Sequence, residues 1–255
     1  MLDIHIHILP GLDDGSPDMD TSLAMADIAL RSGVTRMIVT PHSNQMGRFE
    51  NFASPSLAAD FHRLKEALEA ENLPLRIYPG MEIFADLDLK EKIQRGSLYG
   101  LNRKNYYLVE FPFDADIEWM NDRIEDMMDC GVIPLIAHVE RYYSIQDYPP
   151  QVYEWIQMGC RIQINKGSIF GRFGGRCKGC ADLLLDHGLV TAVASDAHGI
   201  NARTPWLRDG YEELERRYGS RAPELLLEEN PRHILKGEAI PPHGIRPERR
   251  LHFRL

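Results

Sequence analysis

The feature that most limits the fold of this chain is an alternation of short apolar runs with amphipathic segments. Most runs are rich in Val, Ile and Leu and several lack a polar side, which is typical of parallel strands covered on both faces. A helical repeat follows most runs, and a glycine such as Gly33 or Gly131 often closes it. Parallel strands are expected at Leu2–Ile8, Met37–Thr40, Leu75–Tyr78, Tyr106–Phe111, Val132–Ala137, Arg161–Ile164 and Leu189–Ala194.

Strand and helix alternation of this kind predicts βαβ units and a parallel sheet, hence an α/β fold. Seven strands in 255 residues suit a closed (β/α) barrel better than two domains, and an open doubly wound sheet is the alternative. We expect one barrel domain over residues 1–237. Residues 238–255, rich in proline and arginine, are expected to form a C-terminal tail outside the barrel core. Helices are expected at Asp20–Ser32, Leu57–Ala70, Ile117–Asp129, Val152–Met158 and Cys180–His187.

The composition excludes several classes of protein. A formal net charge of −9 argues against free nucleic acid as a partner, because phosphate binding needs a basic surface. No uncharged apolar run is long enough for a membrane helix, and the N-terminus lacks the pattern of a signal peptide. Four cysteines in a chain of this length do not indicate a disulfide scaffold. We therefore expect a cytoplasmic globular protein.

Residues of the types that commonly bind metals, namely His, Asp and Glu, lie at the carboxyl ends of the expected strands. His5 and His7 share one face of the first run, because side chains two positions apart in a strand point the same way. In parallel barrels these strand ends form one rim, where active sites lie. We therefore predict that the polar residues converge. The others at strand ends are His42, Glu82, Glu110, His138, Asp196 and His198, with Asp13 and Asp14 in the loop after the first strand.

This pattern offers five imidazoles and four carboxylates without a thiolate, counting one of the two neighbouring aspartates Asp13 and Asp14. Nitrogen and oxygen ligands of this kind suit manganese, iron or zinc better than magnesium. Nine ligands exceed what one ion needs, so two or three divalent ions are expected. Such a centre would attract a phosphate dianion and lower the pKa of a bound water toward neutrality. The pattern thus predicts a metal-dependent phosphoesterase.

The same motifs resemble a known family. Asp3–Gly15, which reads DIHIHILPGLDDG, is similar to the opening motif of the PHP (polymerase and histidinol phosphatase) superfamily. More narrowly, it resembles the bacterial manganese-dependent protein tyrosine phosphatases of capsule and exopolysaccharide loci. The resemblance spans about residues 1–237 in order. It continues through Thr40-Pro41-His42, Gly80-Met81-Glu82-Ile83, Val109-Glu110-Phe111, Ala137-His138-Val139-Glu140-Arg141-Tyr142, Ala194-Ser195-Asp196-Ala197-His198 and Glu229-Asn230-Pro231.

The resemblance implies a distorted seven-stranded (β/α) barrel with a trinuclear centre of manganese, with iron or zinc as alternatives. It implies that Arg141 and Arg203 bind the substrate phosphate and act in catalysis. It also implies a phosphotyrosine protein as substrate, namely the tail of a bacterial tyrosine kinase. The metal ligands that it implies, with Asp14 preferred over Asp13, are His5, His7, Asp14, His42, Glu82, Glu110, His138, Asp196 and His198.

Other functions stay open at this stage. A histidinol phosphatase or another small-molecule phosphomonoesterase would use the same metals, and a non-catalytic kinase-binding module would keep the fold but lose ligands. A simpler hypothesis for Arg141 is an ion pair with Glu140 or a nearby acid, and for Arg203 an ordinary loop position. The cysteine type of tyrosine phosphatase is excluded, because no cysteine is followed six positions later by arginine.

The remaining cysteines and histidines are expected to have no part in the site. Cys177 and Cys180 have the spacing of a redox or zinc pair, but zinc would need a second pair, and free cysteines usually pack as small hydrophobes. The histidines expected to be non-ligands are His62, His187, His233, His243 and His252.

Overall fold

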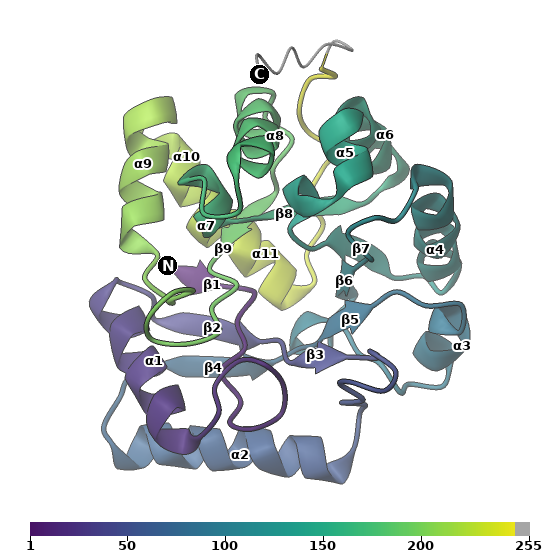
Figure 1. The fold of residues 1–255 in the computed structure, drawn as a ribbon. Helices are drawn as coiled ribbons and strands as arrows, with labels where there is room; N and C mark the ends of the chain where they lie inside the picture. Colours follow the sequence, from purple (N-terminus) through teal and green to yellow (C-terminus); the bar gives the residue numbers. More distant parts are fainter. Residues whose placement is uncertain (248–255) are drawn as a thin grey trace.

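The strands of the computed structural model, which describes residues 1–247, join edge to edge in parallel around one ring (Figure 1). Two of the seven strand positions are each divided into two short strands, for example where Pro41 interrupts the second position. Proline lacks the N–H that a ladder needs. The strands are β1 Leu2–Asp3, β2 Arg36–Val39 with β3 His42–Ser43, β4 Arg76–Pro79 with β5 Glu82–Phe84, β6 Tyr106–Glu110, β7 Ile133–Ile136, β8 Arg161–Asn165 and β9 Ala192–Ala194.

The first and last strand positions close the ring. Ile6 forms a parallel bridge with Ala197. On either side of it, His7 N donates to Ala197 O at 3.0 Å and Asp196 N donates to His5 O at 2.9 Å. The predicted seven-stranded (β/α) barrel is therefore confirmed, and the open sheet is not what the chain forms.

The first strand is shorter than the sequence predicts. Regular pairing ends at Asp3, although the apolar run continues to Ile8. Ile6 N donates to the side-chain Oγ1 of Thr40 at 3.0 Å instead of to a backbone carbonyl. Because a side-chain oxygen replaces the backbone acceptor here, the regular ladder stops. The segment that carries His5 and His7 therefore continues through the barrel without regular strand pairing.

Helices surround the strands on the outside of the ring (Figure 1). The five predicted helices are all present, and the last begins five residues earlier than expected, at Gly175. Gly33, with φ of +92°, follows the first helix in the left-handed conformation that a glycine allows. The helices are α1 Met19–Arg31, α2 Pro55–Ala70, α3 Leu89–Gln94, α4 Ile117–Asp129, α5 Tyr143–Asp147, α6 Pro150–Met158, α7 Lys166–Ile169, α8 Gly175–Asp186, α9 Arg208–Tyr218, α10 Arg221–Glu224 and α11 Asn230–Lys236, with short turns η1 Leu101–Arg103 and η2 Val139–Arg141 and a π-helical turn η3 Leu225–Glu229.

The inside of the barrel changes character along the strands. Tyr106 and Leu108, at the start and middle of β6, share one face of the strand with Glu110 at its end. Ala192 and Ala194 of β9 precede Asp196 in the same alternation. Apolar residues of the strand starts form one buried cluster with residues of α11, whereas the strand ends carry buried acids and histidines. The fold therefore places polar side chains at one end only.

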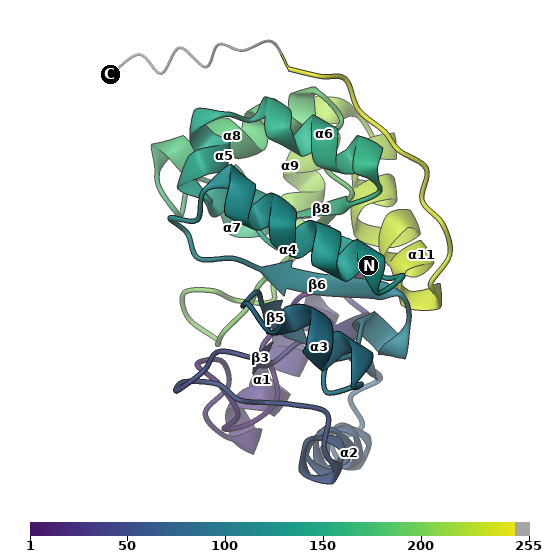
Figure 2. The ribbon, with the colours of Figure 1, turned by 90° about the vertical axis from the view of Figure 1, so that its right-hand side faces the viewer.

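A segment after α11 crosses the other end of the barrel, away from the arrowhead of β6 (Figure 2). Tyr106 donates its hydroxyl to Glu238 O at 2.8 Å, and Arg161 donates to Ile240 O. Ile240 is buried in the apolar cluster of the strand starts. The boundary predicted at residue 237 stays a prediction, and residues 248–255 with His252 lie outside the described part of the chain.

None of the helices described between residues 1 and 247 combines the length and apolar character needed to cross a membrane. The location in the cell stays a prediction.

Candidate metal centre

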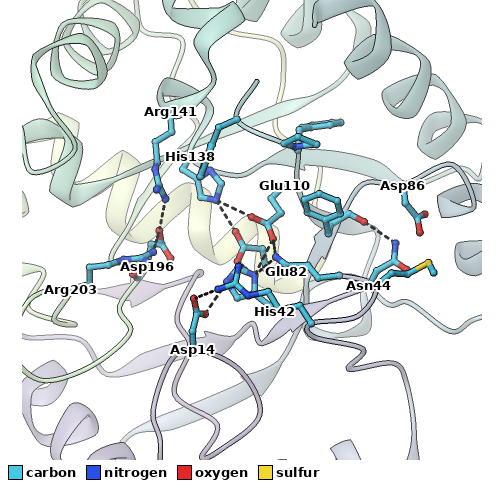
Figure 3. Close-up of a pocket in the computed structure, with 17 residues that line it drawn as sticks. Asp14, His42, Asn44, Glu82, Asp86, Glu110, His138, Arg141, Asp196 and Arg203 are labelled. Atoms are coloured by element: carbon cyan, nitrogen blue, oxygen red, sulfur yellow. Dashed lines mark hydrogen bonds and ion pairs between the residues drawn. The ribbon is translucent and has the colours of Figure 1, made fainter. Parts of the chain in front are cut away.

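The nine predicted ligands come together at the carboxyl end of the barrel. Figure 3 shows Asp14, His42, Glu82, Glu110 and His138 converging at the centre of a pocket. Two residues that follow strands, His138 and Asp196, have φ of +33° and +49°, which is unusual for residues other than glycine. Backbone strain of this kind concentrates at functional sites. The predicted gathering of distant strand ends therefore occurs, although whether they ligate metal stays a proposal.

The first group of donor atoms brings together residues of the first and the last strand positions. His5 Nε2 lies 3.3 Å from His7 Nε2, and both nitrogens lie 3.5 Å from Asp196 Oδ1. Glu82 reaches the same point, with 3.2 Å from its Oε1 to His5 Nε2 and 3.1 Å from its Oε2 to His7 Nε2. Five donor atoms of four residues, from three parts of the chain, thus face one another in a fully buried position.

The second group lies on the other side of Glu82. His42 Nδ1 is 3.0 Å from both Glu82 Oε2 and Glu110 Oε1. His138 Nε2 is 2.8 Å from Glu82 Oε1 and 3.8 Å from Glu110 Oε2. Glu82 therefore faces both groups, with one or both of its oxygens close to each histidine named here.

The third group separates the two neighbouring aspartates. Asp14 Oδ1 lies 3.3 Å from His42 Nε2 and 3.4 Å from His198 Nε2, at the half-open mouth of the site. Asp13 instead accepts hydrogen bonds from His7 Nδ1 at 2.8 Å and from the His42 backbone N–H at 2.9 Å. Asp14 therefore faces the cluster, while Asp13 lies behind two of its histidines and orients them.

The carboxylates and imidazoles of the cluster lie so close together that they shift one another's pKa. Burial disfavours the charged form of Glu82, but the charges of His5 and His42 outweigh it and hold its pKa well below the usual range. The pKa of Asp196 is likewise low despite burial, because His5, His7 and Arg203 stabilise the carboxylate. Burial lowers the pKa of His42, yet nearby carboxylates raise it overall. The low pKa of Glu82 and Asp196 favours the ionised carboxylates that metal binding requires.

The donor set fits divalent ions on two observations. Ligands about 2.0–2.2 Å from one ion lie roughly 3–3.5 Å from one another, which is the spacing of the donor atoms here. Two of the buried donors, Glu82 Oε2 and His198 Nε2, also lack a hydrogen bond of good geometry. Buried polar atoms without partners are costly unless an ion or water satisfies them. Three groups of mutually close donors indicate several metal sites.

A buried amide network supports the ligands and was not predicted. Gln163 Oε1 accepts from His138 N at 2.9 Å and lies 3.1 Å from His5 Nδ1. Gln163 Nε2 donates to Asn165 Oδ1, whose own amide donates to Asp196 Oδ2 at 2.5 Å. The sequence pattern that could have predicted this network lies in β8, where Arg161, Gln163 and Asn165 alternate with isoleucines. Three polar residues on the inner face of a buried strand indicate partners inside the barrel.

The two predicted arginines lie at one side of the pocket, beside Asp196 (Figure 3). Arg203 donates from Nε to Asp196 O at 3.1 Å and pairs with its carboxylate, and Arg141 Nη1 lies 3.8 Å from Asp196 Oδ2. The Arg141 guanidinium carbon is 4.4 Å from the Phe113 ring centre and 4.5 Å from that of Phe173. These two rings, which sequence reasoning did not assign, hold the guanidinium in place by cation–π contact.

The cluster and the arginines open into one cavity of 520 Å³. Its other side carries Asn44 and Asp86, each of which pairs with Lys92. Met46 and Phe113 lie where the cavity meets the surface. The cavity therefore offers a cationic side, a central cluster of ligand atoms and a more apolar opening.

The remaining predictions can be placed as well. Glu140 does not pair with Arg141; it is buried and accepts from Asn165 N at 3.0 Å and Ser168 Oγ at 2.6 Å. Cys177 and Cys180 are reduced and buried in α8. The histidines at 62, 187, 233 and 243 belong to none of the three donor groups found within residues 1–247.

The structure is a parallel (β/α) barrel with a cluster of imidazoles and carboxylates at the carboxyl end of its strands. The solved structure of an organophosphorus hydrolase variant shares the fold with a TM-score of 0.56, at 14% identity over 92% of each chain. A beta-aspartyl dipeptidase from Fervidobacterium islandicum has a TM-score of 0.53 at 14% identity, over 96% of this chain and 78% of the other. At such identities the likeness concerns the fold alone.

Sequence comparison is more specific. Residues 1–236 match the family described as capsular polysaccharide synthesis, CpsB/CapC, and the chain belongs to this family. It is 36% identical to the tyrosine-protein phosphatase YwqE of Bacillus subtilis, covering 96% of this chain and 97% of the relative. It is 32% identical to the tyrosine-protein phosphatase CpsB of Streptococcus pneumoniae, covering 94% and 100%. One solved structure comes from a study of YwqE and CpsB, which describes both as metal-dependent tyrosine phosphatases. It matches with a TM-score of 0.87 at 34% identity, over 97% of this chain and 100% of the other.

Proposed function

We propose that the nine clustered residues hold two or three divalent ions and that Arg141 and Arg203 bind the phosphate of a phosphotyrosine substrate. The enzyme is a metal-dependent tyrosine-protein phosphatase of capsular polysaccharide synthesis. The observation that carries the proposal is the convergence of these ligand types, from nearly the whole chain, beside two arginines in one cavity.

The donor groups suggest how the ions are distributed. One group consists of His5, His7 and Asp196, a second of His42, Glu82 and Glu110, and a third of His7, Asp14, His42 and His198. His138 lies against two members of the second group, Glu82 and Glu110. The set contains imidazoles and carboxylates and no thiolate, which supports manganese, with iron or zinc as alternatives.

When bound, the ions supply Lewis-acid charge for phosphate oxygens and make water a nucleophile near neutral pH. Arg141 and Arg203 add forked donors that match the geometry of phosphate oxygens. Phe113 and Phe173 restrict Arg141, so that less side-chain freedom is lost when the phosphate binds. A phenolate leaves with a pKa near 10, so a tyrosine ester needs less help from a general acid than an alkyl ester does.

The partner is a phosphotyrosine protein. We propose more specifically that it is the tyrosine-rich tail of a bacterial tyrosine kinase. The support is the membership of a family described by capsular polysaccharide synthesis, together with motifs that resemble the phosphatases of capsule loci.

The test compares kcat/KM for a phosphotyrosine peptide, the matching phosphoserine peptide and histidinol phosphate in saturating manganese. We expect the phosphotyrosine peptide to exceed the phosphoserine peptide by at least roughly tenfold, or about 1.4 kcal/mol. A preference for histidinol phosphate would overturn the substrate assignment and leave the metal centre intact. Binding of the kinase tail without turnover would instead favour a non-catalytic module.

A further inference from the structure

Exposed large apolar side chains lie on the segments that follow the strand ends, and two of them line the cavity. Eight such side chains occur within residues 1–247, and six of them lie in the segments that follow successive strands at the carboxyl end of the barrel, five in loops and Tyr143 at the start of α5. Met158 and Ile245 lie elsewhere and serve below as controls. The six, which we call the apolar rim, are Met46 after β3, Leu87 after β5, Phe113 after β6, Tyr143 after β7, Phe170 after β8 and Ile200 after β9.

The apolar rim is continuous with the cavity. Met46 and Phe113 line the cavity itself, and Leu87 directly follows the lining residue Asp86. Tyr143 N donates to Phe113 O at 2.9 Å, which joins two segments of the rim. In Figure 2 the strand β6 points toward the side where these segments project. A molecule whose phosphate lies in the cavity therefore leaves it past Met46 and Phe113, toward the other segments of the rim.

The chemistry of the rim favours apolar over acidic ligands. Single exposed apolar residues are normal, but a group around one opening marks a surface that another molecule covers. Charged side chains near the opening are already paired, Arg48 with Asp14 and Lys92 with Asp86. Leu87 and Met46 are each 76% exposed, so they have most of their apolar surface left to bury.

We propose that the apolar rim binds the polypeptide on either side of the phosphotyrosine and selects substrates with large apolar neighbours over substrates with acidic ones. This inference rests on the proposed function, because it assigns the occupant of the rim from the substrate of the cavity. Burial of the neighbouring side chains against the rim favours the complex through the hydrophobic effect.

The test uses full-length protein with manganese and the double variant Leu87→Ser/Phe170→Ser. These positions lie in loops three strand positions apart in the ring, and neither lines the cavity. The matched control is Met158→Ser/Ile245→Ser, which removes two exposed apolar side chains far from the mouth. Substrates are a phosphotyrosine peptide with leucine and valine neighbours, the same peptide with glutamate neighbours, and para-nitrophenyl phosphate.

For the wild-type enzyme we expect kcat/KM about tenfold higher with the apolar peptide than with the acidic one, or about 1.4 kcal/mol. The rim variant should lose roughly that factor on the apolar peptide and change less than about twofold on para-nitrophenyl phosphate. The control variant should behave like the wild type on all three substrates.

Several outcomes would overturn the proposal. Equal losses on peptide and para-nitrophenyl phosphate, no loss on the peptide, or a wild-type preference for the acidic peptide would each do so. Rim-dependent sedimentation with phosphatidylglycerol vesicles, or a rim-dependent dimer, with unchanged peptide kcat/KM would assign the rim to a membrane or to a second copy. A wild-type enzyme that hydrolyses none of the three substrates would refute the proposed function and the rim proposal with it.

Discussion

At their starts, the barrel strands enclose apolar side chains such as Tyr106 and Leu108, and the segment through Ile240 covers them. At their ends, the same strands carry Glu110, Asp196 and the histidines. Some buried donor atoms there lack a hydrogen bond, and His138 and Asp196 have positive φ. At the strand starts, packing and backbone hydrogen bonds account for the buried groups. At the strand ends, buried donor atoms such as Glu82 Oε2 lack a hydrogen bond, and we propose that ions bind there. The difference indicates that stability and chemistry are separated along the strand axis, as in other parallel barrels.

The largest expected effect comes from removing a ligand at the polar end. Glu82→Ala or His138→Ala should lose bound metal and lower kcat/KM on the order of a thousandfold or more, about 4 kcal/mol, because the ions provide the charge. Elemental analysis and phosphotyrosine peptide kinetics measure both quantities. His62→Ala, a histidine of α2 outside the cluster, is the control. Full activity in a verified metal-free sample would contradict the whole assignment.

The next effect separates binding of phosphate from binding of metal. Arg141→Ala should keep its metal and lose about 2–4 kcal/mol of transition-state stabilisation, as other preorganised charge contacts do. The measurement is kcat/KM alongside metal content. Arg208→Ala, which removes an exposed arginine of α9, should match the wild type. Normal turnover by Arg141→Ala would leave that arginine without a catalytic role.

A smaller effect is expected for the amide behind the ligands. Gln163→Leu keeps the volume but removes the acceptor for His138 N and the partner of His5 Nδ1. Metal affinity should fall roughly 10–100-fold, the usual effect of losing such an orienting partner. Gln163→Glu restores an oxygen acceptor and should recover part of the affinity in a metal titration. Equal affinities for all three proteins would show that Gln163 only packs.

The smallest effect belongs to the apolar end. Ile240→Val should lower the free energy of unfolding by about 1 kcal/mol through a lost methylene. For a chain of this size the Tm should drop by roughly 2–4 °C. Because Ile240 lies at the opposite end of the strands from the ligands, kcat and metal content should not change. A fall in kcat at 25 °C would show that the two ends are coupled.

Much of the fold and of the site was predictable from the sequence, because the relevant patterns are local. Side-chain periodicity and the glycines that follow helices predict where strands and helices lie. The helix α4, for example, has the predicted bounds Ile117–Asp129. The gathering of the candidate ligands was predictable because a residue that ends a parallel strand lies at a common rim whatever its distance in the chain. The short helices α5 and α7 carry too few residues for a period to be visible, so they were missed.

The sequence alone was sufficient to predict the barrel, the end of the barrel where the polar side chains gather, and the residue types available for metals. Tertiary structure decided which neighbour plays which part. Asp14 faces the cluster while Asp13 orients His7, and Phe173 joins Phe113 around Arg141. Gln163 bridges His5 and His138, which lie 158 and 25 residues away from it in the sequence. Periodicity records only which way a side chain points from its own strand, whereas its partners depend on how strands far apart in sequence are placed across the barrel.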